Sequence, residues 1–199
     1  MIDTTIQYYD RNAERFADST INANMKAHHD FFLQYIPKSG NVLDLGCGSG
    51  RDSKKFIELG YSVTAVDGSE ELCKIASKIT GLNVRCLLFK DLDYFEQFDG
   101  VWASASLLHI YKYELQNIFF RIHKAIKPGG ILYASFKYGD FEGERNGRYF
   151  VDLNEKLFNE VIAGIPNFKI QDIRVSYDTR PEHENELWLN AIVMKTASI

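Results

Sequence analysis

Short, continuous apolar runs alternate with helical patterns through the middle of the chain. Each run is largely apolar without a regular alternation of polar positions, which is typical of a strand buried on both faces of a sheet. Five such runs lie at residues 42–45, 62–66, 84–88, 100–104 and 131–136. Buried strands that alternate with helices predict βαβ units and a parallel sheet with helices on both faces.

Helical patterns fill the connections, and two further strands complete the sheet. Helices are expected at residues 4–17, 24–35, 53–59, 69–80, 112–126 and from residue 152 onward. Residues 168–177 and 186–195 alternate or run apolar with little helical period, so we expect an antiparallel pair at one edge of the sheet. The pattern therefore predicts an α/β fold with seven strands.

Composition limits the class of protein. A chain of 199 residues fits one domain, and a formal net charge of −4 gives no attraction to a nucleic-acid backbone. No apolar run approaches the roughly 20 residues that cross a bilayer, and the N-terminus lacks a signal-peptide pattern. We expect a cytoplasmic protein without nucleic-acid or membrane partners, whose three separated cysteines stay reduced.

A glycine-rich turn is the most informative motif. Residues 42–50, VLDLGCGSG, lead from a predicted strand through three alternate glycines into a helix. Such a turn lets a ligand approach the backbone, and free N–H groups at the helix start can hold an anion. A nicotinamide-dinucleotide fingerprint needs G-x-G-x-x-G, but Arg51 stands where its third glycine belongs. An oxidoreductase is therefore disfavoured.

Acidic residues follow the next two predicted strands. Asp67 ends the second strand, where a carboxylate can accept hydrogen bonds from both hydroxyls of a ribose. Its alternative role is the N-cap of the helix at 69–80. Asp91 follows the third strand and is suited to an adenine amino group, with Leu92 against the ring. Alternatively, Asp91 and Asp93 are solvated loop residues.

These motifs, in this order, resemble those of the class I S-adenosylmethionine (SAM)-dependent methyltransferases. The resemblance rests on the D-x-G-x-G-x-G turn, Asp67, Asp91, the fourth strand ending at Ser104-Ala105-Ser106, and residues 127–130, KPGG. It spans most of the chain. It implies a Rossmann-like sheet of order 3-2-1-4-5-7-6 with the last strand antiparallel, SAM as cofactor and S-adenosylhomocysteine as product.

The resemblance also implies the cofactor site. Residues 8–16, YYDRNAERF, are similar to the lead helix of many small-molecule members, which folds over the cofactor. We therefore expect one methyltransferase domain, 1–199, with a helical lid at 1–37 and a core at 38–199. The cofactor-binding residues implied are Tyr9, Asp44, Gly46, Cys47, Gly48, Asp67, Gly68, Ser69, Asp91, Leu92, Ser104 and Ala105.

The methyl acceptor is less well defined. Residues 50–53 and 135–139 look like bacterial tellurite-resistance-related methyltransferases, and the motif for methylating nucleobase amines is absent after the fourth strand. His109 follows that strand and is the candidate general base, although it could equally cap a helix or pack on the cofactor. The other histidines lack paired ligand spacing, so we expect no metal site.

A long segment after the fifth strand interleaves cations with aromatic residues. We interpret residues 137–150 as a lid loop that holds a small anionic or soft acceptor through Lys137, Tyr138, Arg145 and Arg148. The alternative is a solvated connection with internal ion pairs. A second function also stays open, a catalytically silent SAM-binding sensor or subunit, and the chain is expected to be a monomer or a homodimer.

Overall fold

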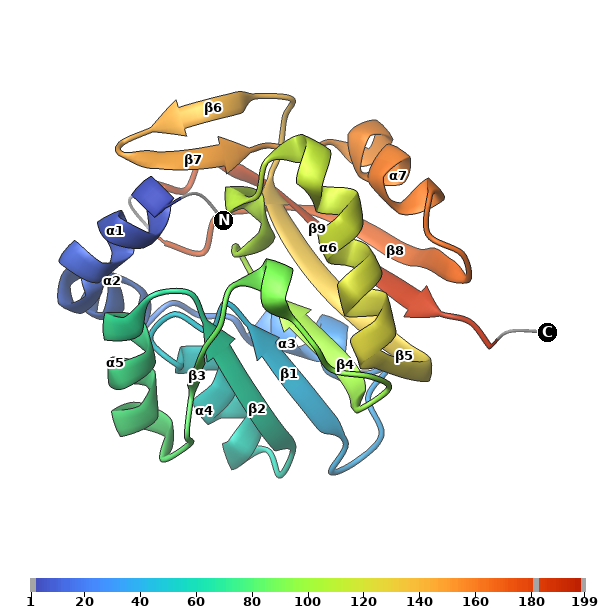
Figure 1. The fold of residues 1–199 in the computed structure, drawn as a ribbon, viewed down its shortest axis with the longest axis horizontal. Coiled ribbons are helices and arrows are strands. Elements are labelled where there is room, and N and C mark those ends of the chain that lie inside the picture. The colour runs from blue at the N-terminus through green and yellow to red at the C-terminus, as the bar shows by residue number, and fades with distance from the viewer. Residues whose placement is uncertain (1–2, 181–182, 198–199) are drawn as a thin grey trace.

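The computed structural model describes residues 3–180 and 183–197. A seven-stranded sheet lies at its centre (Figure 1), in the order β3-β2-β1-β4-β5-β9-β8. The strands are β1 (Asn41–Leu45), β2 (Ser62–Asp67), β3 (Arg85–Cys86), β4 (Phe98–Ala103), β5 (Ile126–Lys137), β8 (Phe168–Tyr177) and β9 (Leu187–Lys195). The first five pair in parallel and β9 is antiparallel to both neighbours. Since β8 and β9 are the sixth and seventh strands of this sheet, the expected strand order is confirmed.

Helices cover both faces of the sheet. They are α1 (Asp3–Arg11), α2 (Ala13–Thr20), α3 (Lys26–Leu33), α4 (Arg51–Glu58), α5 (Glu70–Thr80), α6 (Lys112–Ala125) and α7 (Glu155–Ala163). Helices α6 and α7 lie on one face and α3 and α4 on the other, while α1 and α2 extend beyond one end of the strands (Figure 1). Among the described residues, no helix combines the length and apolar character needed to cross a membrane.

The two-sided burial explains the continuous apolar runs. In β4, Val101 belongs to the core under α6, whereas Trp102 points to the opposite core and stacks on Tyr133 with ring centroids 4.0 Å apart. Successive strand residues face opposite sides, so both layers need apolar side chains. This packing holds the carboxyl ends of the strands in register at one edge.

Three elements differ from the sequence-based expectation. The lead helix is divided at Asn12, whose side chain and backbone N–H both donate to the Tyr8 carbonyl, at 2.8 and 3.1 Å. The third strand keeps only two paired residues, because it is an exposed edge strand. The expected lid loop instead contains a hairpin of β6 (Glu142–Arg145) and β7 (Arg148–Val151). Asn146 and Gly147 both have positive φ at its tip, the backbone geometry of a two-residue hairpin turn.

Candidate functional site

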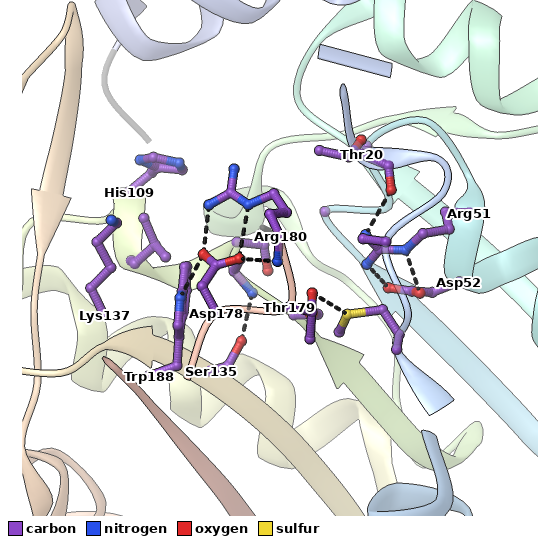
Figure 2. Close-up of a pocket in the computed structure, with 18 of the residues that line it drawn as sticks. Thr20, Arg51, Asp52, His109, Ser135, Lys137, Asp178, Thr179, Arg180 and Trp188 are labelled. Atoms are coloured by element: carbon purple, nitrogen blue, oxygen red, sulfur yellow. Dashed lines mark hydrogen bonds and ion pairs between the residues drawn. The ribbon is translucent and has the colours of Figure 1, made fainter. Parts of the chain in front are cut away.

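A cavity of about 390 Å³ lies at the carboxyl edge of the parallel strands. Its walls come from the glycine turn after β1, the end of β2, the segment after β4, helices α1 and α2, the β6–β7 hairpin and the β8–β9 connection. The volume is in the range of small-molecule sites. Figure 2 shows several of these side chains converging from separate elements.

The structure brings most of the predicted site residues to this cavity. Those that line it are Tyr9, Gly46, Cys47, Gly48, Asp67, Ser104, Ala105, His109, Lys137, Arg145 and Arg148. Those that do not are Asp44, Gly68, Ser69, Asp91, Leu92 and Tyr138. The first group spans both the expected cofactor region and the expected acceptor region, so the two predicted regions share one cavity.

Several residues of the second group support the site from behind. Asp44 is buried and accepts a hydrogen bond from Ser53 Oγ at 2.6 Å. Burial, reinforced by repulsion from Asp52, raises the pKa of Asp44. A Cβ on Gly68 would lie 2.6 Å from Ile6 Cδ1, so this glycine allows α1 to pack closely against the end of β2.

Asp91, Leu92 and Tyr138, also of the second group, have other surroundings. Asp91 is exposed in a short 3-10 turn, and Leu92 is buried in the core under α6. Phe89, in the same turn, lines the cavity. The Tyr138 hydroxyl donates to Glu155 at 2.8 Å.

The glycine turn needs its glycines for both backbone and space. Gly46, Gly48 and Gly50 have φ of 80°, 56° and 84°, which side chains rarely adopt. A Cβ on Gly46 would lie 2.4 Å from Ser106 Cβ, and one on Gly48 would lie 3.2 Å from the Phe16 ring. The turn therefore leaves main chain, not side chains, at the cavity wall.

Asp67 is fixed by the backbone of its neighbours. Its carboxylate accepts from Gly48 N and from Ser69 N, both at 2.9 Å. Burial outweighs these two hydrogen bonds and raises the pKa of Asp67. The N-cap of α5 is Ser69, whose side chain accepts from Leu72 N, and not Asp67. Asp67 therefore presents a buried carboxylate to the cavity.

His109 has a single assignable tautomer. It lies in a 3-10 turn, Leu107–His109, and its Nδ1 is 2.6 Å from the Tyr149 carbonyl oxygen. Since a carbonyl only accepts, Nδ1 carries the proton, and Nε2 accepts from the Tyr9 hydroxyl at 2.9 Å. Burial lowers the pKa of His109 to about 4, and burial raises that of Tyr9. Both groups are therefore neutral near pH 7.

The cavity cations differ in their partners. Lys137 pairs with Glu186, Arg145 makes two bonds to Asp152, and Arg180 makes two bonds to Asp178. Arg148 donates to the Tyr9 hydroxyl at 3.3 Å and packs on the Tyr8 and Phe150 rings, 4.8 and 5.1 Å from their centroids.

Arg148 lacks a compensating anion. Among the side chains that the structure describes, no carboxylate pairs with it, and its buried Nε has no hydrogen-bond partner. A buried donor without a partner is costly, so this guanidinium is suited to an incoming anion.

Two groups of cavity residues were not expected as site residues. Arg51 and Asp52, at the start of α4, form an ion pair with bonds of 2.9 and 2.8 Å. Acidic residues in the first turn of a helix are common, so their pattern carries no separate signal. Asp178 and Glu186 come from the β8–β9 connection, which only the antiparallel pairing of these strands brings over the cavity.

Comparisons with known proteins agree with this geometry. The model of a family described as a methyltransferase domain matches residues 42–130, from the glycine turn to Gly130. An uncharacterized methyltransferase of Staphylococcus carnosus is 26% identical over 178 residues, covering 81% of this chain and 86% of that protein. A ubiquinone biosynthesis O-methyltransferase of Xanthomonas axonopodis pv. citri is 35% identical over 115 residues, covering 52% and 47%.

Solved structures share the fold. The 1,6-didemethyltoxoflavin-N1-methyltransferase of Burkholderia thailandensis, solved with 1,6-didemethyltoxoflavin and S-adenosylhomocysteine, superposes with a TM-score of 0.79. The match covers 98% of this chain and 88% of that one at 23% identity. The likeness extends over both the parallel sheet and the elements that cover the cavity.

Proposed function

Because this chain belongs to the class I SAM-dependent methyltransferases, we propose that it transfers a methyl group by in-line displacement to a small-molecule acceptor. The observation that carries the proposal is the shared cavity, which joins the glycine turn and Asp67 to the groups around His109 and Arg148. The chain would act as one domain, with residues 1–37 as a lid over a core of 38–199.

The cofactor half of the cavity fits SAM. The glycine turn at Gly46, Cys47 and Gly48, which lines the cavity, is suited to the methionine end, and the Asp67 carboxylate is suited to the ribose hydroxyls. When bound, SAM supplies an electrophilic methyl group on a sulfonium. Ser104 and Ala105 would lie beside it at the end of β4. The assignment of Asp91 and Leu92 to the adenine rests on their position in the sequence and on the resemblance, since neither residue lines the cavity.

The acceptor half fits a small anion. Lys137, Arg145 and Arg180 already have carboxylate partners, whereas Arg148 has none among the described side chains. A guanidinium surrounded by aromatic rings favours a single negative charge in a water-poor site. The unpaired guanidinium therefore supports an acceptor that is an oxyanion or a soft anion such as a thiolate, in line with the resemblance to tellurite-resistance-related methyltransferases.

The protonation state of His109 also favours an acceptor that is already an anion. A pKa of about 4 makes its Nε2 a weak base, and the Tyr9 hydroxyl already occupies the lone pair. General-base catalysis works best when the pKa lies near the working pH. An acceptor that arrives deprotonated needs no base, so positioning and exclusion of water would supply most of the acceleration. His109 would then hold Tyr9 over the cavity.

The test is turnover of methyl-labelled SAM by the purified protein in a metabolite extract. We expect label in the methylated form of a small anionic acceptor, and much less label with Asp67→Ala at a SAM concentration that does not saturate the variant. Stoichiometric SAM binding without turnover would favour the alternative of a catalytically silent sensor or subunit. Absence of SAM binding would contradict the cofactor assignment, and a labelled product that derives from a cationic or wholly apolar acceptor would contradict the assignment of Arg148.

A further inference from the structure

Arg51 joins the core, the lid and the cavity. Figure 2 shows its side chain between Asp52 and Thr20, on the cavity wall away from His109 and Lys137. Arg51 Nε and Nη2 donate to the two Asp52 oxygens at 2.9 and 2.8 Å. Its Nη1 donates to the Thr20 carbonyl at the end of α2, at 3.2 Å.

Asp52 is itself fixed from behind. Its carboxylate also accepts from His29 Nε2 and from Trp102 Nε1, both at 2.9 Å. Although burial opposes ionisation, Arg51 and the His29 hydrogen bond hold the pKa of Asp52 well below its usual range. Four donors thus saturate a buried carboxylate, which holds the guanidinium in one position.

Arg51 keeps donors to spare. A guanidinium has five N–H groups, and the three bonds described use Nε–H and one N–H each of Nη1 and Nη2. The remaining N–H of each terminal nitrogen is therefore available, and the side chain is 22% exposed at the cavity wall. Paired terminal N–H groups match the two oxygens of a carboxylate.

The position of these donors selects the ligand. Gly48 and Ser49, three and two positions before Arg51, line the cavity, and this is the turn assigned above to the methionine end of the cofactor. Among the lid residues that line the cavity, Phe16 and Met25 offer no charge to a carboxylate. Arg51 is thus the cation adjacent to the glycine turn.

We propose that Arg51 binds the α-carboxylate of the cofactor and, through the Thr20 carbonyl, couples that binding to the closed position of α2. The proposal rests on the proposed function, since it assumes that SAM occupies the glycine turn. A ligand with a carboxylate would accept hydrogen bonds from the two remaining terminal N–H groups of Arg51, hold the guanidinium in place and keep α2 packed over the cavity. A ligand without a carboxylate would leave these two N–H groups without a partner.

Decarboxylated SAM isolates this contact, because it lacks only the carboxylate. Loss of two charge-assisted hydrogen bonds should weaken its binding to the wild-type protein about 10- to 100-fold relative to SAM. Hydrogen–deuterium exchange should show that SAM protects residues 13–20 and that decarboxylated SAM at saturation protects them less.

Calorimetry on two variants gives the matched comparison. Arg51→Ala should bind SAM and decarboxylated SAM with similar affinity. Lys54→Ala removes an exposed cation from the same helix, outside the cavity lining, and should keep the wild-type preference for SAM.

The outcomes separate this proposal from the function. Equal wild-type affinity for the two ligands would overturn it, and this comparison needs no variant that could misfold. If Arg51→Ala weakens both ligands equally, Arg51 is only structural and the proposal is overturned. Failure of the wild-type protein to bind either ligand would overturn the proposed function itself.

Discussion

A protein with asparagine in place of His109 should lose less stability than the wild-type protein as the pH falls below about 6.5, which is the pKa of histidine in the unfolded chain. The asparagine amide can still donate to the Tyr149 carbonyl in place of Nδ1. It cannot take up a proton, so the variant removes one titrating group and keeps one of its hydrogen bonds. Wild-type protein and variant should therefore differ most in weak acid.

The magnitude follows from the pKa difference between the folded and unfolded states. Burial lowers the pKa of His109 to about 4 in the folded protein. As the pH falls, the unfolded chain therefore binds a proton at His109 that the folded chain does not bind, and the free energy of unfolding decreases. A pKa depressed by about 2.5 units corresponds to a loss of about 2 kcal/mol between about pH 7 and pH 5.

Urea unfolding at these two pH values measures the effect. Burial also lowers the pKa values of His28 and His123, but both remain in the variant, so their contributions cancel in the difference. Tyr9→Phe keeps the imidazole and is the control: it should lose about 1 kcal/mol at both pH values with the acid dependence retained. Equal acid losses in wild-type protein and His109→Asn would refute a buried, neutral His109.

Four further predictions concern the cavity and the residues behind it. Asp44→Asn should be more stable than wild-type protein in urea at about pH 8. Burial and repulsion from Asp52 raise the pKa of Asp44 in the folded protein, so the wild-type protein loses stability as the pH rises through that pKa. Equal stability of the two proteins would contradict the raised pKa. Asp67→Ala should weaken SAM about 10- to 100-fold in calorimetry through loss of charge-assisted hydrogen bonds, and an unchanged Kd would leave Asp67 only the role of orienting the glycine turn. Arg148→Ala should raise the KM of an anionic acceptor and leave the Kd of SAM unchanged in steady-state and binding assays; unchanged kinetics would exclude an acceptor contact. Deleting the residues through Phe16 should preserve the circular-dichroism signal of the sheet but lower cofactor affinity and turnover, and full activity or complete unfolding would contradict a lid.

The strands of the sheet could be predicted because each one is marked by the residues of its own short segment. Apolar runs such as residues 42–45 and 131–136 are buried on both faces, so their composition predicts the strand type. The alternate glycines after β1 are required by left-handed backbone at Gly46, Gly48 and Gly50. The strand order came from the resemblance, and the two-residue hairpin after β5 was missed although Asn146-Gly147 is a strong turn signal.

The tertiary structure decided the chemical state of the side chains. Tyr9 and His109 are 100 positions apart in the chain and hydrogen-bonded in the fold, and Arg51 reaches Thr20 across 31 positions. The sequence by itself determined that cations and aromatic residues follow β5, but it could not show that Arg145 is neutralised by Asp152 while Arg148 is not. Residue types are properties of the chain, whereas desolvation and pairing depend on which distant groups the sheet brings together, and these set the pKa values and the free donors of the cavity.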